Sequence, residues 1–154
     1  MSDAVARQVI LAIDDAPENL DIIKNILVPE YTVKGAVNGT MALKIAAMQP
    51  PDLILLDLLM PEMDGYEVCR RLKADPVTEE IPVIFLTAQD TVLEEAKALM
   101  LGAVDFLLKP VMPQLLISRV RVHLMQVRRW KAREAKLRHR IEELEAELGT
   151  RRQA

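Results

Sequence analysis

Five short apolar runs alternate along the chain with longer stretches in which apolar residues recur at helical spacing. The runs show no helical period and are bounded by Pro, Gly or Asp, which is typical of strands buried on both faces. Four of them cover residues 8–13, 53–56, 82–86 and 104–108, whereas the fifth, 31–37, has mixed faces and is expected nearer an edge of the sheet. This strand–helix alternation with short connections predicts an α/β fold, a doubly wound five-stranded parallel sheet with helices on both faces.

The starts and ends of the predicted helices follow from residues with strong positional preferences. Proline suits the first position of a helix, Thr and Asp suit the cap before it, and glycine suits the position after it. The expected markers are Pro17, Thr40, Asp64 with Glu67 as a capping-box partner, Asp90 or Thr91, Gly102 and Pro113.

Four of the five predicted strands end in a reactive or charged side chain. These residues are Asp14 and Asp15, Asp57, Thr87 and Lys109. The carboxyl ends of parallel strands meet at one edge of the sheet, where α/β proteins bind ligands. Each residue alone is also typical of an ordinary loop, so the prediction of a site rests on their joint placement.

The predicted group contains three carboxylates, one hydroxyl and one ammonium. Crowded carboxylates repel one another unless a cation neutralises them, and oxygen ligands favour Mg²⁺ before Ca²⁺ where water completes the shell. Thr87 and Lys109 would then suit an anion with several oxygens, such as a phosphoryl group. Asp57 is the expected nucleophile that receives it.

Charge divides the chain into two parts. Residues 1–113 carry 9 Lys and Arg against 18 Asp and Glu, whereas residues 114–154 carry 11 against 5. An acidic front and a basic tail indicate two modules. The 154 residues include a single cysteine, Cys69, which excludes an internal disulfide, and no apolar run reaches membrane length, so we expect no membrane insertion and a cytoplasmic protein.

The tail continues in helical pattern to about Leu148 with a heptad seam. The seam residues are Leu116, Val120, His123, Val127, Trp130, Glu134, Leu137, Ile141, Leu144 and Leu148. Such a stripe predicts a coiled-coil homodimer through residues 114–148, most simply a parallel one. In that register Arg140 pairs with Glu145 across the strands, while Arg133 and Arg138 repel. The expected division is a core at 1–113, a stalk at 114–150 and a disordered tail at 151–154.

Other features of the tail and of Cys69 carry weaker functional readings. The basic run 128–140 has the outline of a nucleic-acid-binding helix, but seam residues run through it and no base-reading Asn is present, so a solvated basic face is favoured. His123 and His139 lack metal-ligand spacing. Cys69 is expected on a helix face and not as a nucleophile.

The strand ends together resemble the receiver domain of bacterial two-component response regulators, over about residues 7–122. The segments that carry the resemblance are Val9–Asp15, Asp57-Leu58-Leu59-Met60-Pro61-Glu62-Met63-Asp64-Gly65, Val83–Ala88 and Gly102–Pro110. The resemblance implies a flavodoxin-like fold with strand order 2-1-3-4-5. It also implies a phospho-acceptor that catalyses only its own phosphorylation and dephosphorylation.

The resemblance assigns roles to single residues. It implies that Asp57 takes phosphate from the histidine of a sensor kinase. Mg²⁺ would be bound by Asp15, Asp57 and the backbone carbonyl of Leu59, with Asp14 acting partly through water. Thr87 and Lys109 would contact the phosphoryl group, and the Lys109–Pro110 bond would be cis.

The switch of the family also maps onto this chain. Thr87 would move toward the phosphate while the ring of Phe106 turns inward, although Phe106 lacks the hydroxyl of the commoner Tyr and core filling is the alternative reading. Ala88 leaves access to the phosphate, the Leu59 side chain cannot orient a water, and Gln89 can. We expect slow to moderate self-dephosphorylation.

The segment 116–124 resembles receivers joined to cyclic-dinucleotide enzymes by a helical stalk. No such enzyme is present, so the output domain is missing or separate, and the chain is a piece of a longer regulator or acts by its stalk alone. One rival is a constitutive dimerising scaffold with an idle receiver. Another is a hydrolase of the haloacid dehalogenase type, which needs a second Asp where this chain has Leu59.

Overall fold

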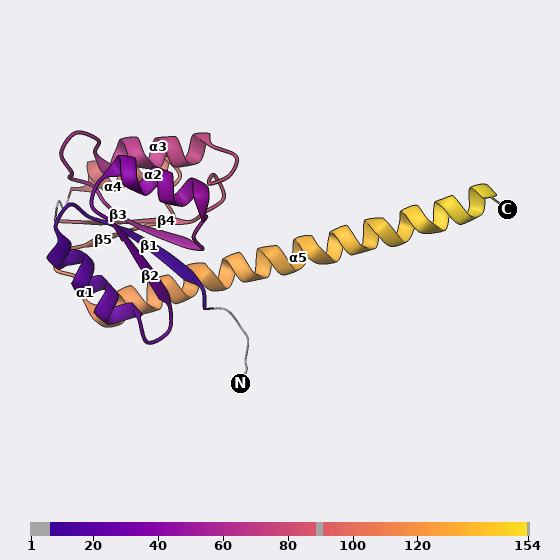
Figure 1. Ribbon diagram of the computed structural model, residues 1–154, viewed down its shortest axis with the longest axis horizontal. Helices are drawn as coiled ribbons and strands as arrows, with labels where there is room; N and C mark the ends of the chain where they lie inside the picture. Colours follow the sequence, from indigo (N-terminus) through magenta and orange to yellow (C-terminus); the bar gives the residue numbers. More distant parts are fainter. Residues whose placement is uncertain (1–6, 89–90, 154) are drawn as a thin grey trace. The chain divides into compact units, whose positions relative to one another are not determined.

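The computed structural model describes residues 7–88 and 91–153, and in these ranges five parallel strands form one sheet (Figure 1). Its order is β2-β1-β3-β4-β5, which confirms the predicted topology. The strands are β1 (Val9–Ile13), β2 (Thr32–Ala36), β3 (Leu53–Asp57), β4 (Val83–Thr87) and β5 (Asp105–Leu108).

Helices follow the strands in strict alternation and cover both faces of the sheet. They are α1 (Pro17–Leu27), α2 (Gly39–Met48), α3 (Gly65–Ala74), α4 (Val92–Met100) and α5 (Pro113–Gln153). Figure 1 shows α2, α3 and α4 on one face, with α1 and the beginning of α5 on the other. This two-sided cover is why the strands read as apolar runs without alternation.

The central strands β3 and β4 are buried at every position. Both are apolar except at their last residues, Asp57 and Thr87, which are also buried. The core on the side of α2 and α3 includes Leu56, Val68 and Phe85. Burying these two polar side chains costs free energy unless they have hydrogen-bonding or ionic partners. We therefore expect such partners at the edge of the sheet where Asp57 and Thr87 lie.

Helix starts differ in detail from the sequence prediction. Asn38, not Thr40, caps α2, because its side chain accepts a hydrogen bond from the amide of Met41 and the helix already begins at Gly39. Asp64 caps α3 as predicted and accepts from the amide of Glu67.

Of the remaining markers that the structure describes, the capping-box role of Glu67 is wrong and the others hold. The carboxylate of Glu67 pairs with Arg70 and Arg71, and no bond back to the cap residue accompanies those pairs in the described contacts. Thr91 caps α4, while Asp90 lies outside the described residues. Gly102 follows α4 with a φ of 101°, a conformation that favours glycine.

Helix α5 runs without a break from Pro113 to Gln153, so residues 151–153 of the expected disordered tail are helical. Gly149 does not stop it, since a solvent-facing glycine costs a helix only about 1 kcal/mol. By its internal contacts the chain forms two units, one ending at His123 and one beginning at Leu124, ten residues later than the predicted boundary. None of the helices in the described ranges combines the length and apolar character that a membrane span needs.

The first seam residues of α5 are used inside the first unit. The side chains of Leu116 and Val120 are fully buried, and His123 lies 3.0 Å from a carboxylate oxygen of Asp105. These three residues are therefore not free to line a stalk. The exposed part of the heptad seam begins later in α5 than predicted.

Candidate functional site

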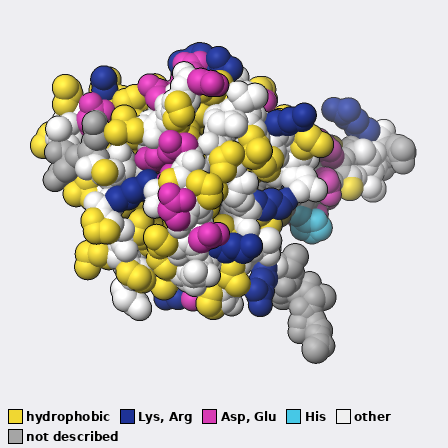
Figure 2. Space-filling view, turned by 60° about the vertical axis from the view of Figure 1, so that its left-hand side comes forward, with side chains coloured by type: hydrophobic (Ala, Val, Ile, Leu, Met, Phe, Trp, Pro, Cys, Tyr) yellow, Lys and Arg dark blue, Asp and Glu magenta, His cyan; other side chains and the backbone are white. Residues whose placement is uncertain are grey.

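The four predicted strand ends meet at one edge of the sheet. Asp14 directly follows β1, Asp57 and Thr87 end β3 and β4, and Lys109 directly follows β5. Strands β1, β3, β4 and β5 are neighbours in the sheet, which is why their ends converge. Figure 2 turns this side of the molecule forward and shows acidic side chains gathered near the centre of the face.

Three carboxylates form a compact group at this edge. Oxygen atoms of Asp14, Asp15 and Asp57 all lie within 4.8 Å of one another, with Asp14 and Asp57 buried and Asp15 exposed. Groups of like charge at this separation repel. An all-oxygen donor set of this kind, open to water on one side, fits a hard divalent cation such as Mg²⁺.

The ammonium of Lys109 offsets part of this negative charge. Its Nζ lies 2.5 Å from Oδ2 of Asp14 and 3.5 Å from Oδ1 of Asp57. Lys109 is itself mostly buried, so its charge is only weakly screened by water. One cation thus faces two of the three carboxylates, and a net negative charge remains for a further cation to neutralise.

Asp14 is also held by residues of the loop and helix that follow it. Its carboxylate accepts a hydrogen bond from the amide of Ala16 at 2.9 Å, and the side-chain amide of Asn19 donates to both of its oxygens. Sequence reasoning missed Asn19. An amide side chain in the first turn of α1, five residues after Asp14, was the available signal.

The pKa of the Asp57 carboxyl is raised above its ordinary value. Burial is the largest cause, and the negative charge of Asp14 adds to it. The charge of Lys109 and hydrogen bonds from Lys109 and from the backbone of Leu59 act in the opposite direction. Burial disfavours the charged form of the Asp57 carboxyl, and a cation bound at this group would stabilise that form.

The loop after β3 packs against the backbone of Asp57. The amide of Gly65 donates to the carbonyl of Leu58 at 2.8 Å, and a Cβ at Gly65 would lie 2.3 Å from the carbonyl oxygen of Asp57. Glu62 in the same loop has a φ of 68°, which is uncommon for a residue other than glycine. Close backbone approach therefore explains the glycine at 65 and ties the loop to Asp57.

A sequence model of the response regulator receiver domain matches residues 10–121, which is most of the chain. The protein belongs to the response regulator receiver family. The matched range contains every strand except Val9, the first residue of β1, and all the converging residues at the edge of the sheet, so family and geometry agree.

Curated relatives match the receiver over a small part of their own length. A probable cyclic di-GMP phosphodiesterase of Vibrio cholerae is 48% identical over 119 residues, which are 77% of this chain and 27% of that protein. The response regulator PleD of Caulobacter vibrioides is 46% identical over 113 residues, 73% of this chain and 25% of PleD. The chain therefore spans about a quarter of the length of these relatives.

Solved structures of receivers superpose on the same part of the chain. The receiver domain of a signal transduction histidine kinase from Syntrophus aciditrophicus gives a TM-score of 0.73 at 39% identity and covers 79% of this chain and 93% of its own. Chemotaxis protein CheY4 of Vibrio cholerae gives 0.72 at 26% identity, covering 75% and 98%.

The two predicted switch residues lie beside the receiver's carboxylates and core. Thr87 is fully buried, and its carbonyl accepts from the amide of Lys109 at 2.8 Å. Phe106 is half-buried and its ring centroid lies 6.5 Å from that of Phe85. The Lys109–Pro110 peptide bond is cis, as the resemblance implied.

Tyr66 on α3 links the ring of Phe85 to side chains of α4, the helix that follows β4. The ring of Tyr66 lies 6.0 Å from Phe85, its hydroxyl pairs with the carboxylate of Glu94, and the ammonium of Lys97 lies 5.3 Å from the ring centroid. Burial and Glu94 both raise the pKa of the Tyr66 phenol. These contacts join α3 to α4 close to the predicted switch.

The other residues that the sequence analysis discussed do not belong to the carboxylate group wherever the structure describes them. The residue expected to orient water, Gln89, lies outside the described residues, and Ala88 is exposed. Cys69 is buried on α3, and burial raises the pKa of its thiol. His139 pairs with Glu143 at 3.0 Å on α5.

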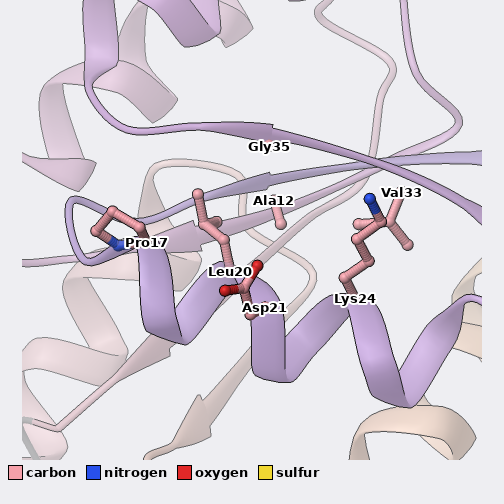
Figure 3. Close-up of a pocket in the computed structure, with 7 residues that line it drawn as sticks. All are labelled: Ala12, Pro17, Leu20, Asp21, Lys24, Val33 and Gly35. Carbon is pink, nitrogen blue, oxygen red and sulfur yellow. The ribbon is translucent and has the colours of Figure 1, made fainter.

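A hollow of about 220 Å³ lies between α1 and β2 (Figure 3). It is lined by Ala12, Pro17, Leu20, Asp21, Lys24, Val33 and Gly35. None of these residues belongs to the carboxylate group, and the contacts that line the hollow give no ligand chemistry beyond one acid and one amine. We assign it no role.

Proposed function

We propose that this receiver takes a phosphoryl group on Asp57 from the histidine of a sensor kinase. The observation that carries the proposal is the ammonium of Lys109 lying within 3.5 Å of Asp57 and 2.5 Å of Asp14 at the edge of the sheet. A buried carboxylate beside a fixed cation and two further acids suits an acceptor of phosphorus.

The residues of the chain divide the chemistry among them. An oxygen of Asp57 attacks phosphorus, while the ammonium of Lys109 and the hydroxyl of Thr87 hold phosphoryl oxygens. Asp14, Asp15, Asp57 and the carbonyl of Leu59 would hold Mg²⁺, in line with the grouped carboxylates. When bound, the ion supplies positive charge to the oxygens of the transferring group.

We further propose that the receiver acts in signalling and turns over no separate substrate. One relative over the receiver region is histidine kinase P4 of Formosa agariphila, 38% identical over 104 residues, and others are transcriptional regulators. A sensor histidine kinase is the expected donor and a separate or longer-chain output domain the expected target. The single buried cysteine suits the reducing cytoplasm.

The output is proposed to pass through α5 as a dimeric helical stalk. Helix α5 begins in the receiver body, where Leu116 and Val120 are buried, and continues through the second unit as the same helix. A change at Thr87 and Phe106 would alter the packing of α4, β5 and the start of α5, and so the pairing of the stalk. A beryllofluoride-dependent change in dimer affinity would support this coupling.

The test is phosphorylation by acetyl phosphate with Mg²⁺, followed by mass measurement of the intact chain. We expect one acid-labile phosphoryl group on the wild type and none on Asp57→Asn. The group should persist for longer than seconds without a phosphatase, because the Leu59 side chain cannot orient water. Lack of any phosphoryl group would favour a constitutive scaffold with an idle receiver.

Turnover of generic phosphate esters would instead favour a hydrolase of the haloacid dehalogenase type. We regard that rival as disfavoured, since the position two residues after Asp57 is Leu59, whose side chain is apolar and exposed.

A further inference from the structure

The exposed part of the α5 seam begins at Trp130, which is 50% exposed, and beyond Glu134 it continues in four aliphatic residues near the end of the helix. Leu137, Ile141, Leu144 and Leu148 are 62%, 55%, 41% and 51% exposed, and they follow one another at heptad spacing. The earlier seam residues Leu116 and Val120 are fully buried in the receiver body. A stripe of four large apolar residues on an exposed helix is unfavourable in water and calls for a partner.

The charges that flank this stripe change sign along the helix. In the heptad, the flanking residues before Ile141 are Lys131, Arg133, Arg138 and Arg140, whereas those after it are Glu145 and Glu147, followed by Arg152 at the end of the helix. Flanking charges form the bridges between helices of a coiled coil and so set the orientation of the pair. This helix thus has a basic half and an acidic half on either side of Ile141.

A parallel pair uses these charges poorly. In that orientation Glu134 faces Glu134 of the second copy within the seam, and Arg133 faces Arg138. Arg140 facing Glu145 and Glu147 facing Arg152 are favourable. Like charges placed opposite each other weaken or forbid a register, as they do when proteins reject wrong partners.

An antiparallel pair with Ile141 packed opposite Leu144 of the second copy uses the charges better. Leu137 then packs opposite Leu148, so the four central layers are wholly apolar. Six residues of each copy gain partners of opposite sign. The pairs are Arg138 with Glu145, Arg140 with Glu147, and Glu134 with Arg151, and the unfavourable one is Lys131 with Arg152.

We propose that the occupant of this stripe is a second copy of the chain, paired antiparallel over residues 134–151. The proposal deepens the proposed function, since it sets the orientation of the stalk through which the receiver would signal. Existing ion pairs within the helix are compatible with it: Arg138 lies 3.0 Å from Glu134 and Arg140 lies 3.0 Å from Glu143. Both pairs are exposed, so both arginines can also reach a partner helix at little cost.

Disulfide formation between variants of the full chain that each carry one added cysteine tests the orientation. Leu137→Cys and Leu148→Cys are each oxidised alone and as an equal mixture. In the antiparallel pair, residue 137 meets 148, while two copies of residue 148 are separated by 11 residues, or about 16 Å along the helix. We expect disulfide dimers in the mixture and none in either variant alone.

The native Cys69 is buried and its thiol has a raised pKa, so it gives little background. Disulfides in each variant alone would establish a parallel pair and overturn the proposal. No disulfide in any sample, with a monomer in sedimentation across the concentration series, would overturn the second copy as occupant.

A charge exchange gives an independent test. Arg140→Glu alone and Glu147→Arg alone should each weaken dimerisation about tenfold, because each sets like charges opposite in both symmetry-related positions. The double variant should recover most of the loss in an antiparallel pair. In a parallel pair the double variant should be weaker than either single one, which would contradict the proposal.

The phosphoryl-acceptor function and the stalk can fail separately. Asp57 labelling by acetyl phosphate is measured on the same variants, whose substitutions lie far along α5 from the carboxylate group. Labelling with a parallel or monomeric stalk would refute only the proposed antiparallel pair, whereas an antiparallel stalk without labelling would refute only the phosphoryl-acceptor function.

Discussion

At the scale of single residues, the site depends on how closely the loop after β3 can approach Asp57. Gly65 lies against the backbone of Asp57 and Leu58, and a Cβ there would meet backbone atoms at 2.3 and 2.8 Å. Backbone atoms cannot step aside as the end of a flexible side chain can. The absence of a side chain at Gly65 therefore lets the backbone of Asp57 keep its position.

We expect Gly65→Ala to lower the free energy of unfolding by about 3 kcal/mol, the upper range for overpacking a core. The forced shift of Asp57 should also reduce labelling by acetyl phosphate at least tenfold. Urea denaturation and intact mass measure the two effects.

Gly149→Ala is the matched control, since nothing lies within 4 Å of a Cβ at that position. It should leave labelling and the stability of the receiver body unchanged. Equal behaviour of the two variants would show that the close approach at Gly65 is unimportant.

The site residues that the sequence could predict are those at the carboxyl ends of strands, since the order of the strands alone brings them to one edge of the sheet. Asp14, Asp57, Thr87 and Lys109 follow buried strands, and parallel topology alone brings such ends together. Asn19 could not be placed in this way, because its contact with Asp14 depends on the path of the loop into α1. The bond from the backbone of Leu59 to Asp57 likewise carries no side-chain signal.

At the scale of elements, helix starts show where local preference and observed geometry differ. Thr40 and Asn38 are both good cap residues, and the sequence alone led us to Thr40. In the structure Asn38 is extended and bonds the amide of Met41, so the helix begins at Gly39 despite the poor propensity of glycine. The backbone conformation entering from β2 decides between two caps of similar preference.

Asn38→Ala should therefore destabilise the receiver by about 1 kcal/mol, the usual cost of losing a cap. Thr40→Ala is the matched control: Thr40 is exposed inside the first turn, and alanine there should change stability by less than about 0.5 kcal/mol. Chemical denaturation of the two variants measures the difference. A larger loss of stability for Thr40→Ala than for Asn38→Ala would show that Thr40 is the cap of α2.

Helix α5 is the element whose packing the hydrophobic periodicity predicted least well. The heptad pattern correctly indicated one long helix, but it assigned Leu116, Val120 and His123 to a stalk. The structure uses Leu116 and Val120 in the receiver core and His123 beside Asp105. An apolar stripe on a helix does not show which surface packs against it. In α5 the first part of the stripe packs inside the receiver, whereas the later part is exposed.

At the scale of the whole molecule, cation binding should be coupled to folding. The three grouped carboxylates repel one another in the folded state, so a cation that binds there should stabilise the fold by mass action. At ten times its dissociation constant, Mg²⁺ should add about 1.4 kcal/mol and raise the melting temperature by about 3 °C. Chelation with EDTA should reverse the rise.

The control for this prediction exchanges acids inside and outside the group. Asp15→Asn should lose most of the Mg²⁺-dependent rise, while Asp21→Asn, an exposed acid on α1, should keep it. A rise of equal size in both variants would mean that Mg²⁺ acts through general screening and not at the carboxylate group.

The central claim is that Asp57 accepts phosphorus beside a cation held by its neighbouring acids. A crystal structure of the receiver with Mg²⁺ and beryllofluoride tests it most directly. We predict the beryllium bonded to a carboxylate oxygen of Asp57, the metal ion among Asp14, Asp15 and Asp57, and the ammonium of Lys109 against a fluorine. Beryllofluoride bound elsewhere, or Lys109 turned away from Asp57 with no metal among the acids, would contradict the account.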